Sequence, residues 1–288
     1  MGTKYNSLIE NYIQMNKITI FVACHKPVEV HSDKMYHPIH VGRAISSCKE
    51  QMDMIGDDTG NNISEKNRFY SELTAQYWAW KNYHDSVYIG FCHYRRYFAK
   101  WLTPSKIDEM FNKGTDVIVT GPYLRSHNRW NYLKTFVCSE DLAIMQMVIK
   151  KMYPDYFKTL SQYGNDFLDY PLNMFICKRE LFEEYAEWLF SILFECEKYV
   201  HLSPYSRARR LYGYLSEFLM PVFFIRNGYR MASVPFFRVD DEIDVRGIPF
   251  KWKLKRLALK TIYSREKNNE TEFDISVMLG LKNDGINI

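Results

Sequence analysis

The strongest constraint on the fold is a set of short apolar runs that alternate with segments of helical periodicity. Three runs, rich in β-branched and aromatic side chains, have the character of buried strands, at residues 18–24, 86–92 and 116–120. Apolar stripes at helical spacing occur at residues 67–82, 139–152, 181–200 and 207–219. Strands that alternate with helices predict an α/β fold with a mainly parallel sheet flanked by helices.

Length and composition fit one α/β domain with additions at both ends. The chain has 288 residues, of which 47% are hydrophobic, so it can form one core but is short for two full domains. We expect an N-terminal extension at 1–16, the α/β domain at 17–240 and a basic, helical C-terminal extension at 241–288.

Two regions of the domain are expected to depart from this simple alternation. The helix at 207–219 should stop before Pro221, because proline disrupts a helix interior, which leaves residues 222–225 and 231–234 as late strands. Residues 28–67 are polar and rich in turn-forming residues, and a loop of that length is typically functional.

The sequence indicates neither export nor a membrane span. Residues 1–17 lack the apolar stretch of a signal peptide, and no apolar run approaches the roughly 20 residues that a spanning helix needs. The six cysteines are scattered, without CxxC spacing, as is typical of free thiols in a reducing compartment. We therefore expect a cytoplasmic protein.

Basic residues are concentrated in one C-terminal segment. Residues 246–267 contain eight Lys or Arg and one acid, whereas the rest of the chain has 30 basic and 33 acidic residues. Trp252, Leu254 and Leu257 interleave with these charges. The segment fits either an anionic membrane surface, at the inner face of the plasma membrane, or a solvated helix packed on the body. No nucleic-acid-binding motif accompanies it, so nucleic acid is not an expected partner.

Each of the three predicted strands ends in residues suited to ligand binding. His25-Lys26 follow the first strand, His93-Tyr94-Arg95-Arg96 the second and Gly121-Pro122-Tyr123 the third. In open parallel sheets, ligands bind in the crevice beyond the carboxyl ends of the strands. The sequence therefore predicts a binding site where these segments meet.

The segment after the second strand has the chemistry of an anion site. Arginine forks match phosphate oxygens bidentately, and Arg95 and Arg96 keep their charge at every physiological pH. Tyr94 can stack on a base or a sugar ring. The alternative is that the arginines form surface ion pairs with nearby acids.

The polar stretch 56–64 is rich in carboxylates, amides and hydroxyls. Asp57, Asp58, Asn62 and Ser64 are suited to gripping ribose or sugar hydroxyls, or to holding the loop itself through Asx turns. The two aspartates are also candidate Mg²⁺ ligands, because Mg²⁺ on a diphosphate takes one or two carboxylates. If the arginines neutralise the diphosphate, no metal is needed.

Five stretches together resemble one bacterial protein family, long catalogued as a domain of unknown function in capsular and exopolysaccharide synthesis proteins. The stretches are residues 17–25, 56–82, 89–98, 173–176 and 213–217. The resemblance covers residues 17–235, and its central motifs, GDDTGNNIS, ELTAQYWAWKN and HYRRY, are long and unusual.

The resemblance implies a GT-A-like glycosyltransferase, and some relatives are associated with galactofuranosyl transfer from the uridine-diphosphate sugar. The implied partners are a nucleotide sugar and a glycan or lipid-linked acceptor, in surface polysaccharide synthesis. Ordinary GT-A enzymes hold a metal with an acidic Asp-x-Asp motif after the strand equivalent to 87–92. This sequence has His-Tyr-Arg-Arg in that place, so we expect neither a metal nor another cofactor.

The resemblance and the residue chemistry together assign residues to the donor. The expected donor-binding residues are Ala23, His25, Lys26, Asp57, Asp58, Asn62, Ser64, Asn67, Tyr77, His93, Tyr94, Arg95 and Arg96. Arg95 and Arg96, helped by His93 and Lys26, would stabilise the negative charge that grows on the departing diphosphate.

The acceptor side is expected at Asp169, Asn173 and Met174, although Leu172 stands where relatives often have a small residue. An inverting transferase also needs a carboxylate that takes the acceptor proton. Glu217 and Asp141 are the candidates, with Asp169 behind them. Each has a structural alternative: an ion pair with Arg209 or Arg210 for Glu217, and a favourable helix-start position for Asp141.

Two other functions fit the same residues. A nucleotide-sugar hydrolase or phosphotransferase would use the same cleft but would release free sugar or sugar phosphate without an acceptor. A non-catalytic scaffold of a polysaccharide assembly complex would have no affinity for nucleotides and would tolerate Arg95→Ala.

Overall fold

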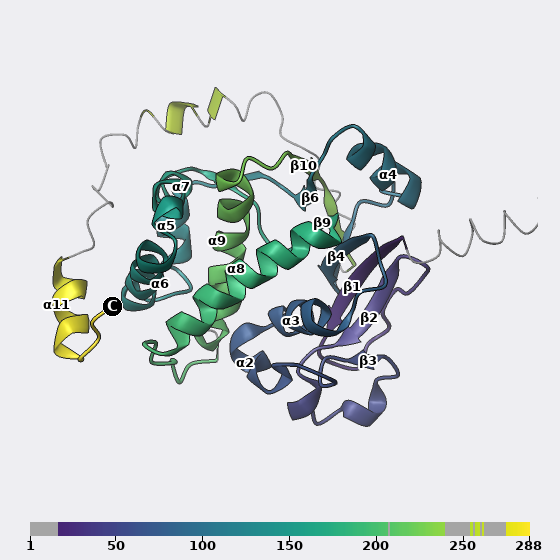
Figure 1. Ribbon diagram of the computed structural model, residues 1–288, viewed down its shortest axis with the longest axis horizontal. Helices are drawn as coiled ribbons and strands as arrows, with labels where there is room; N and C mark the ends of the chain where they lie inside the picture. Colours follow the sequence, from purple (N-terminus) through teal and green to yellow (C-terminus); the bar gives the residue numbers. More distant parts are fainter. Residues whose placement is uncertain (1–16, 207, 240–253, 256, 260, 262–274) are drawn as a thin grey trace, which may run out of the picture. The chain divides into compact units, whose positions relative to one another are not determined.

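The expected alternation of strands and helices is present in the computed structural model, which describes residues 17–206, 208–239, 254–255, 257–259, 261 and 275–288 (Figure 1). The predicted extension at 1–16 and most of the basic segment 246–267 lie outside the described residues. The chain divides into two compact units, which are described separately below. The first comprises Met1–Thr120, Leu172–Ala186 and Arg230–Arg246, and the second Gly121–Pro171, Glu187–Tyr229 and Gly247–Ile288.

The first unit is built on one mixed, mostly parallel sheet, which confirms the predicted fold class. Its strands, in sheet order, are β10 (Met231–Val234), β6 (Val117–Thr120), β9 (Phe175–Lys178), β4 (Tyr88–His93), β1 (Ile18–Cys24), β2 (Tyr36–His40) and β3 (Ile55–Gly56). All neighbours are parallel except β9, which runs antiparallel to both β4 and β6. The carboxyl ends of β4 and β6 therefore meet the beginning of β9.

A short antiparallel extension leaves the sheet at the carboxyl end of β4. The chain turns back into β5 (Arg96–Phe98), which pairs with β4 and also with β11 (Phe236–Arg238). Residues from the middle and the end of the domain thus become neighbours beside the last residue of β4.

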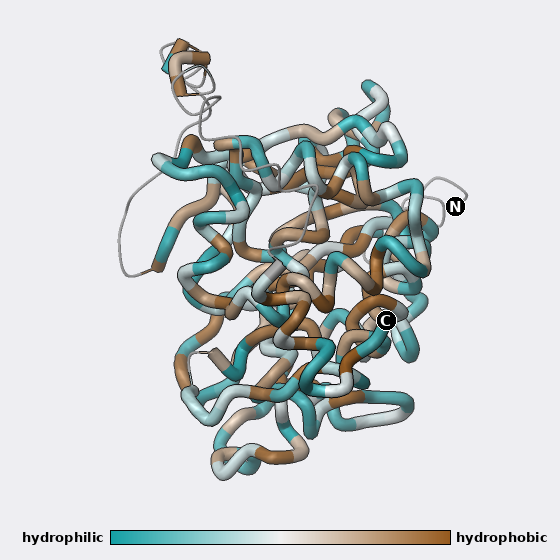
Figure 2. The backbone as a smooth tube through the Cα atoms, turned by 90° about the vertical axis from the view of Figure 1, so that its left-hand side faces the viewer, coloured by the Kyte–Doolittle hydropathy of each residue, from teal (hydrophilic) through white to brown (hydrophobic). Residues whose placement is uncertain are grey.

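Helices cover the sheet through aromatic contacts. Phe21 of β1 stacks on Phe91 of β4, so the two rings lie on one face of the sheet. On that face Phe21 contacts Trp78 of α3 (Leu73–Asn82), and Phe91 contacts Phe182 of α8 (Arg179–Glu197). All seven residues of β1 are buried, as expected for a strand covered on both faces. In Figure 2 the peripheral loops are mostly hydrophilic.

The predicted helix at 67–82 is interrupted. It consists of α2 (Asn67–Tyr70) and α3, with Ser71 between them at a φ of 53°. The predicted long loop at 28–67 is also shorter than expected, because it contains β2, β3 and the 3-10 turns η1 (Arg43–Ile45), η2 (Lys49–Gln51) and η3 (Ser64–Lys66). A further helix of this unit, α4 (Pro104–Asn112), places Phe111 against Tyr88.

The second unit is mainly helical, with one two-stranded ribbon. Its elements are β7 (Tyr123–Leu124), α5 (Arg129–Leu133), α6 (Ser139–Met152), α7 (Pro154–Gly164), β8 (Leu168–Asp169), the later part of α8, η4 (Ala208–Arg210), α9 (Leu211–Arg226) and α11 (Ile275–Asn283). None of the described helices has both the length and the apolar character that a membrane span requires.

The prediction of a strand at 222–225 is wrong, because α9 continues through Pro221 to Arg226. A proline inside a helix costs about 3 kcal/mol, but α9 is buried along most of its length. Phe218 packs on Trp130 and Phe223 packs on Trp188. This tertiary packing outweighs the local preference of the proline.

Candidate functional site

The predicted site begins where β1 and β4 end side by side. Ala23 lies opposite His93 in the parallel ladder, and the Ala23 carbonyl accepts a hydrogen bond of 3.1 Å from the Tyr94 N–H. The chain then reverses through Tyr94 and Arg95, because His93 pairs with Arg96 across the hairpin. The structure thus brings the first two predicted segments together at one edge.

Tyr94 is the buried centre of a group of basic side chains, which we call the Tyr94 cluster: His25, Lys26, His93, Tyr94 and Arg95. The Tyr94 ring is 5% exposed. Its centroid lies 4.4 Å from that of His93 and 5.6 Å from that of His25. The Lys26 Nζ lies 5.7 Å, and the Arg95 guanidinium 5.3 Å, from the same ring. Because Lys26 and Arg95 are exposed, their charges are accessible to an anion, and His25 is exposed beside them.

A second basic group, the cationic row, consists of His93, Arg96 and Arg238. His93 pairs with Arg96 in β5, and Arg96 pairs in turn with Arg238 in β11. Directly opposite residues of antiparallel strands project from the same face. The row therefore places further basic side chains next to the predicted anion site.

Arg238 is the residue of this row that sequence reasoning missed. A single arginine after Phe236 and Phe237 has no motif around it. Its neighbours become visible only through the pairing of β5 with β11, which joins positions more than a hundred residues apart in the chain.

Asp57 and Ser64 hold the polar loop from inside. Asp57 is fully buried, and its carboxylate accepts hydrogen bonds from the Gly42 N–H at 2.8 Å, the Arg43 N–H at 3.1 Å and the Ser64 hydroxyl at 2.5 Å. The Ser64 oxygen also accepts from the Ala44 N–H. These contacts fit the loop-holding alternative, and a role of either residue at the donor stays a prediction.

Asp58 is held by two cations. Arg43 and Lys49 each donate to one of its carboxylate oxygens at 3.1 Å. Burial opposes ionisation, but these two donors outweigh it, and the pKa of Asp58 lies below its usual value. Among the described residues, no three His, Cys, Asp or Glu side chains gather as a metal ion would require.

The other predicted donor residues of this region connect the loop to α3. Asn62 accepts from the Ser64 N–H, and Asn67 donates to the Ser71 carbonyl and the Thr74 hydroxyl. The Tyr77 hydroxyl donates to Asn61. The two central sequence motifs are therefore clamped together, since Trp78 and Asn82 of α3 also bind the loop, at Thr59 and Asn61.

Asp169 is the centre of a buried ion cluster in the second unit. Its carboxylate is within 2.7 Å of the Arg125 Nε and 2.9 Å of an Arg129 Nη. Asp169 is fully buried and Arg129 is 2% exposed. Burial disfavours the charged guanidinium, but Tyr163, Asp169 and Glu217 together raise the pKa of Arg129. Asp169 therefore already has its counter-charges within the protein.

The two predicted catalytic carboxylates have different surroundings. Glu217, on α9, acts electrostatically on Arg129, and the expected ion pair with Arg209 or Arg210 stays a prediction. Asp141, in the first turn of α6, lies beside Cys138. Burial raises the pKa of Asp141 above its usual value. A catalytic role of either residue stays a prediction.

The predicted acceptor residues Asn173 and Met174 immediately precede β9. Both are 1% exposed. Asn173 donates from its amide nitrogen to the carboxylate of Glu72 at 2.8 Å. Glu72 belongs to the ELTAQYWAWKN motif, but its spacing in that motif gave no sign of this partner.

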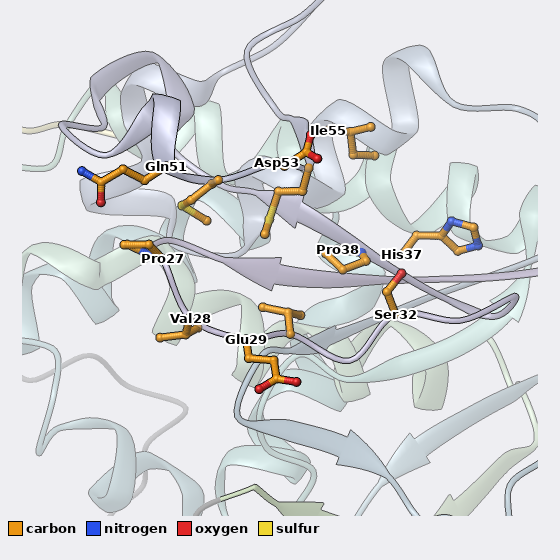
Figure 3. Close-up of a pocket in the computed structure, with 12 residues that line it drawn as sticks. Pro27, Val28, Glu29, Ser32, His37, Pro38, Gln51, Asp53 and Ile55 are labelled. Carbon is orange, nitrogen blue, oxygen red and sulfur yellow. The ribbon is translucent and has the colours of Figure 1, made fainter.

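A separate groove of about 690 Å³ lies over β2 in the first unit (Figure 3). Its walls come from the segment after β1 and the segment before β3, and they combine apolar side chains such as Val28 and Met52 with the acids Glu29 and Asp53. None of the predicted site residues lines this groove.

The comparison with known proteins agrees with the fold. The apo structure of WbbM, described as a bifunctional glycosyltransferase, matches with a TM-score of 0.69 and 27% identity over 81% of this chain. The chain corresponds to 47% of the length of WbbM, and among curated proteins none matches. Residues 19–228 match the family described as a domain of unknown function, DUF4422. Because this match covers most of the sequence, the chain belongs to the DUF4422 family.

Proposed function

We propose that this chain is a glycosyltransferase that moves a hexosyl group from a UDP-sugar to a glycan or lipid-linked acceptor. The observation that carries the proposal is the Tyr94 cluster at the carboxyl edge of β1 and β4. Accessible basic side chains around a buried aromatic ring suit a nucleotide diphosphate, and this edge is where open α/β sheets bind ligands.

We propose further that transfer needs no metal. The transition state of glycosyl transfer resembles an oxocarbenium ion, and negative charge grows on the departing diphosphate. Preorganised cations aimed at that charge supply the largest part of the rate gain. Arg95 and Lys26, exposed beside Tyr94, are the side chains that would supply it, with the cationic row beside them.

Similarity supports the reaction class and suggests the first substrates to test. WbbM is described as a glycosyltransferase, and the motifs resemble proteins of surface polysaccharide synthesis, some of which are associated with galactofuranosyl transfer. UDP-galactofuranose is therefore the first donor to test. In this setting the acceptor is a growing polysaccharide or its lipid-linked precursor, and the basic segment 246–267 would hold the enzyme at an anionic membrane surface.

The test is calorimetric titration of the protein with UDP, with and without EDTA, beside Arg95→Ala. We expect binding that survives EDTA and weakens about 10- to 100-fold in the variant, since a hydrogen bond to a charged group contributes about 1.5–3 kcal/mol. Arg230→Ala is the matched control. Arg230 precedes β10 at the opposite edge of the sheet, where it pairs with Asp116.

The other outcomes separate the alternatives. Absence of UDP binding by the wild type would contradict the proposal and favour the scaffold. Binding that is lost only with EDTA would contradict the metal-free mechanism. Release of free sugar from the donor at the same rate with and without acceptors would identify a hydrolase instead.

A further inference from the structure

Unusual backbone conformations in the described residues gather at one place. Three residues other than glycine have a φ in the left-handed region: Ser71 at 53°, Leu172 at 83° and Asn173 at 49°. This region is rare for residues with a side chain, and for a bulky residue such as leucine it is a marked departure. Such conformations persist only where the surrounding structure enforces them, and they cluster at functional sites.

The three residues flank a single side-chain contact. Ser71 directly precedes Glu72, and Leu172 directly precedes Asn173. The Asn173 amide donates to the Glu72 Oε1 at 2.8 Å across 101 positions of the chain. Asn173 is 1% exposed, whereas Glu72 is partly exposed. Two segments with positive φ therefore meet at this one hydrogen bond.

This contact lies at the edge of the sheet that carries the basic groups. In the antiparallel pairing of β4 with β9, Phe91 lies opposite Phe175. His93 lies two residues after Phe91 in β4, and Asn173 lies two residues before Phe175, ahead of β9. Both stand at the carboxyl edge of β4. The Glu72–Asn173 contact therefore lies beside the end of β4, where the Tyr94 cluster begins.

We propose that Glu72 is the catalytic base of this site and that Asn173 is its positioning residue, an assignment that rests on the proposed function. The acceptor hydroxyl gives its proton to the Glu72 carboxylate while its oxygen forms a bond to the anomeric carbon of the donor. The bond from that carbon to the diphosphate oxygen breaks, and its electron pair leaves with UDP. A single displacement of this kind inverts the anomeric configuration.

Exposure separates Glu72 from the buried acids Asp57 and Asp169, and Asp58, which is partly exposed, is paired with Arg43 and Lys49. Asp57 and Asp169 are fully buried, the first among backbone donors and the second between two arginines. A proton acceptor must come within hydrogen-bond reach of the acceptor hydroxyl. A partly exposed carboxylate at the ligand edge meets this requirement, and a fully buried one does not.

Glu72→Gln tests the assignment. The glutamine oxygen still accepts from Asn173, so the local structure is kept, but the amide cannot take a proton. We expect kcat, measured as UDP released from UDP-galactofuranose with a panel of alkyl glycosides or with water as acceptor, to fall about 10²- to 10⁴-fold. The Kd for UDP should change less than about threefold, since a catalytic base contacts the acceptor hydroxyl and not the nucleotide. Glu65→Gln, an exposed acid of η3, is the matched control.

Two further variants separate a base from a merely structural acid. Added formate, a small carboxylate, should restore turnover to Glu72→Ala in proportion to its concentration. Asn173→Gly tolerates the positive φ, and we expect it to lower kcat about tenfold while the KM for the donor is unchanged.

Each outcome decides between the proposals. Turnover by Glu72→Gln within about threefold of the wild type overturns the assignment while leaving the transferase intact. Loss of UDP binding together with turnover in Glu72→Gln also overturns it, because the residue would then support the fold or the donor. Failure of the wild type to bind UDP overturns the proposed function and the assignment with it.

Discussion

Two arginine-rich regions of this protein use the same side chain in opposite ways. In the second unit, Arg125 and Arg129 surround the buried carboxylate of Asp169. In the first unit, Arg95 and Arg96 follow a strand end, and Arg238 joins them through β11. Arg129 is 2% exposed, whereas Arg95 and Arg238 are exposed.

The difference between the two regions is one of exposure. A buried guanidinium requires a counter-charge within the protein, because an unpaired buried charge is strongly destabilising. An arginine that binds a ligand must instead be accessible to solvent, as Arg95 and Arg238 are. Mutations around Asp169 should therefore lower stability, whereas mutations around Tyr94 should weaken nucleotide binding.

The largest effect is expected for Asp169→Asn. The substitution keeps the size of the side chain but leaves the buried Arg129 without the charge of Asp169, which should destabilise the protein by about 3–5 kcal/mol. Urea unfolding followed by circular dichroism measures this loss. Asp116→Asn removes the partly exposed ion pair with Arg230 and should cost less than about 1 kcal/mol. Equal losses for the two variants would contradict the structural role of Asp169.

Arg238→Ala tests whether the arginine that strand pairing places beside Arg96 takes part in nucleotide binding. We expect UDP to bind about tenfold more weakly, since a charge-assisted hydrogen bond is lost, with no change in the urea midpoint. Calorimetry measures the binding. Unchanged affinity would remove Arg238 from the site and restrict the anion site to the residues around Tyr94.

Substitutions of Leu172, which lies in the first unit, test whether its backbone is strained by the positive φ. At ordinary positions glycine is less stable than alanine by about 0.5–1 kcal/mol. At a φ of 83° the order should reverse, with Leu172→Gly more stable than Leu172→Ala by about 1 kcal/mol. Both variants lose the same leucine contacts, so the difference in their urea midpoints isolates the backbone. The usual order would mean that Leu172 is not strained.

The smallest effect is expected for Asp141→Asn, which contrasts a partly buried acid with the fully buried Asp169. Burial raises the pKa of Asp141 in the folded protein, so the folded state binds the proton more tightly than the unfolded state does. Ionisation therefore destabilises the fold as pH rises through that pKa. The variant should be slightly more stable than the wild type at pH 7 and should match it near about pH 3. Urea midpoints across this range measure the difference, and loss of transfer activity would instead restore Asp141 as the base.

The sequence predicted where strand ends converge, but not every residue that lies beside them. It predicted that three strand ends converge, because the carboxyl ends of parallel strands share one edge. The structure places two of them, His25-Lys26 and His93-Tyr94-Arg95-Arg96, side by side, whereas the third, Gly121-Pro122-Tyr123, begins the second unit. The sequence does not reveal that Arg238 lies beside Arg96 or that Asn173 is the partner of Glu72. These positions depend on pairings across more than a hundred residues, which no local pattern encodes.

The sequence by itself determined the fold class and the chemistry of the strand ends, because burial periodicity and residue type are local properties. Only the tertiary structure decided which polar residues are accessible and which are neutralised inside. Asp57 and Glu72 are both acids of the sequence motifs, yet one is enclosed by Gly42, Arg43 and Ser64 and the other is held by Asn173 and partly exposed. Burial and hydrogen-bond partners come from distant segments, and they set the role of each group.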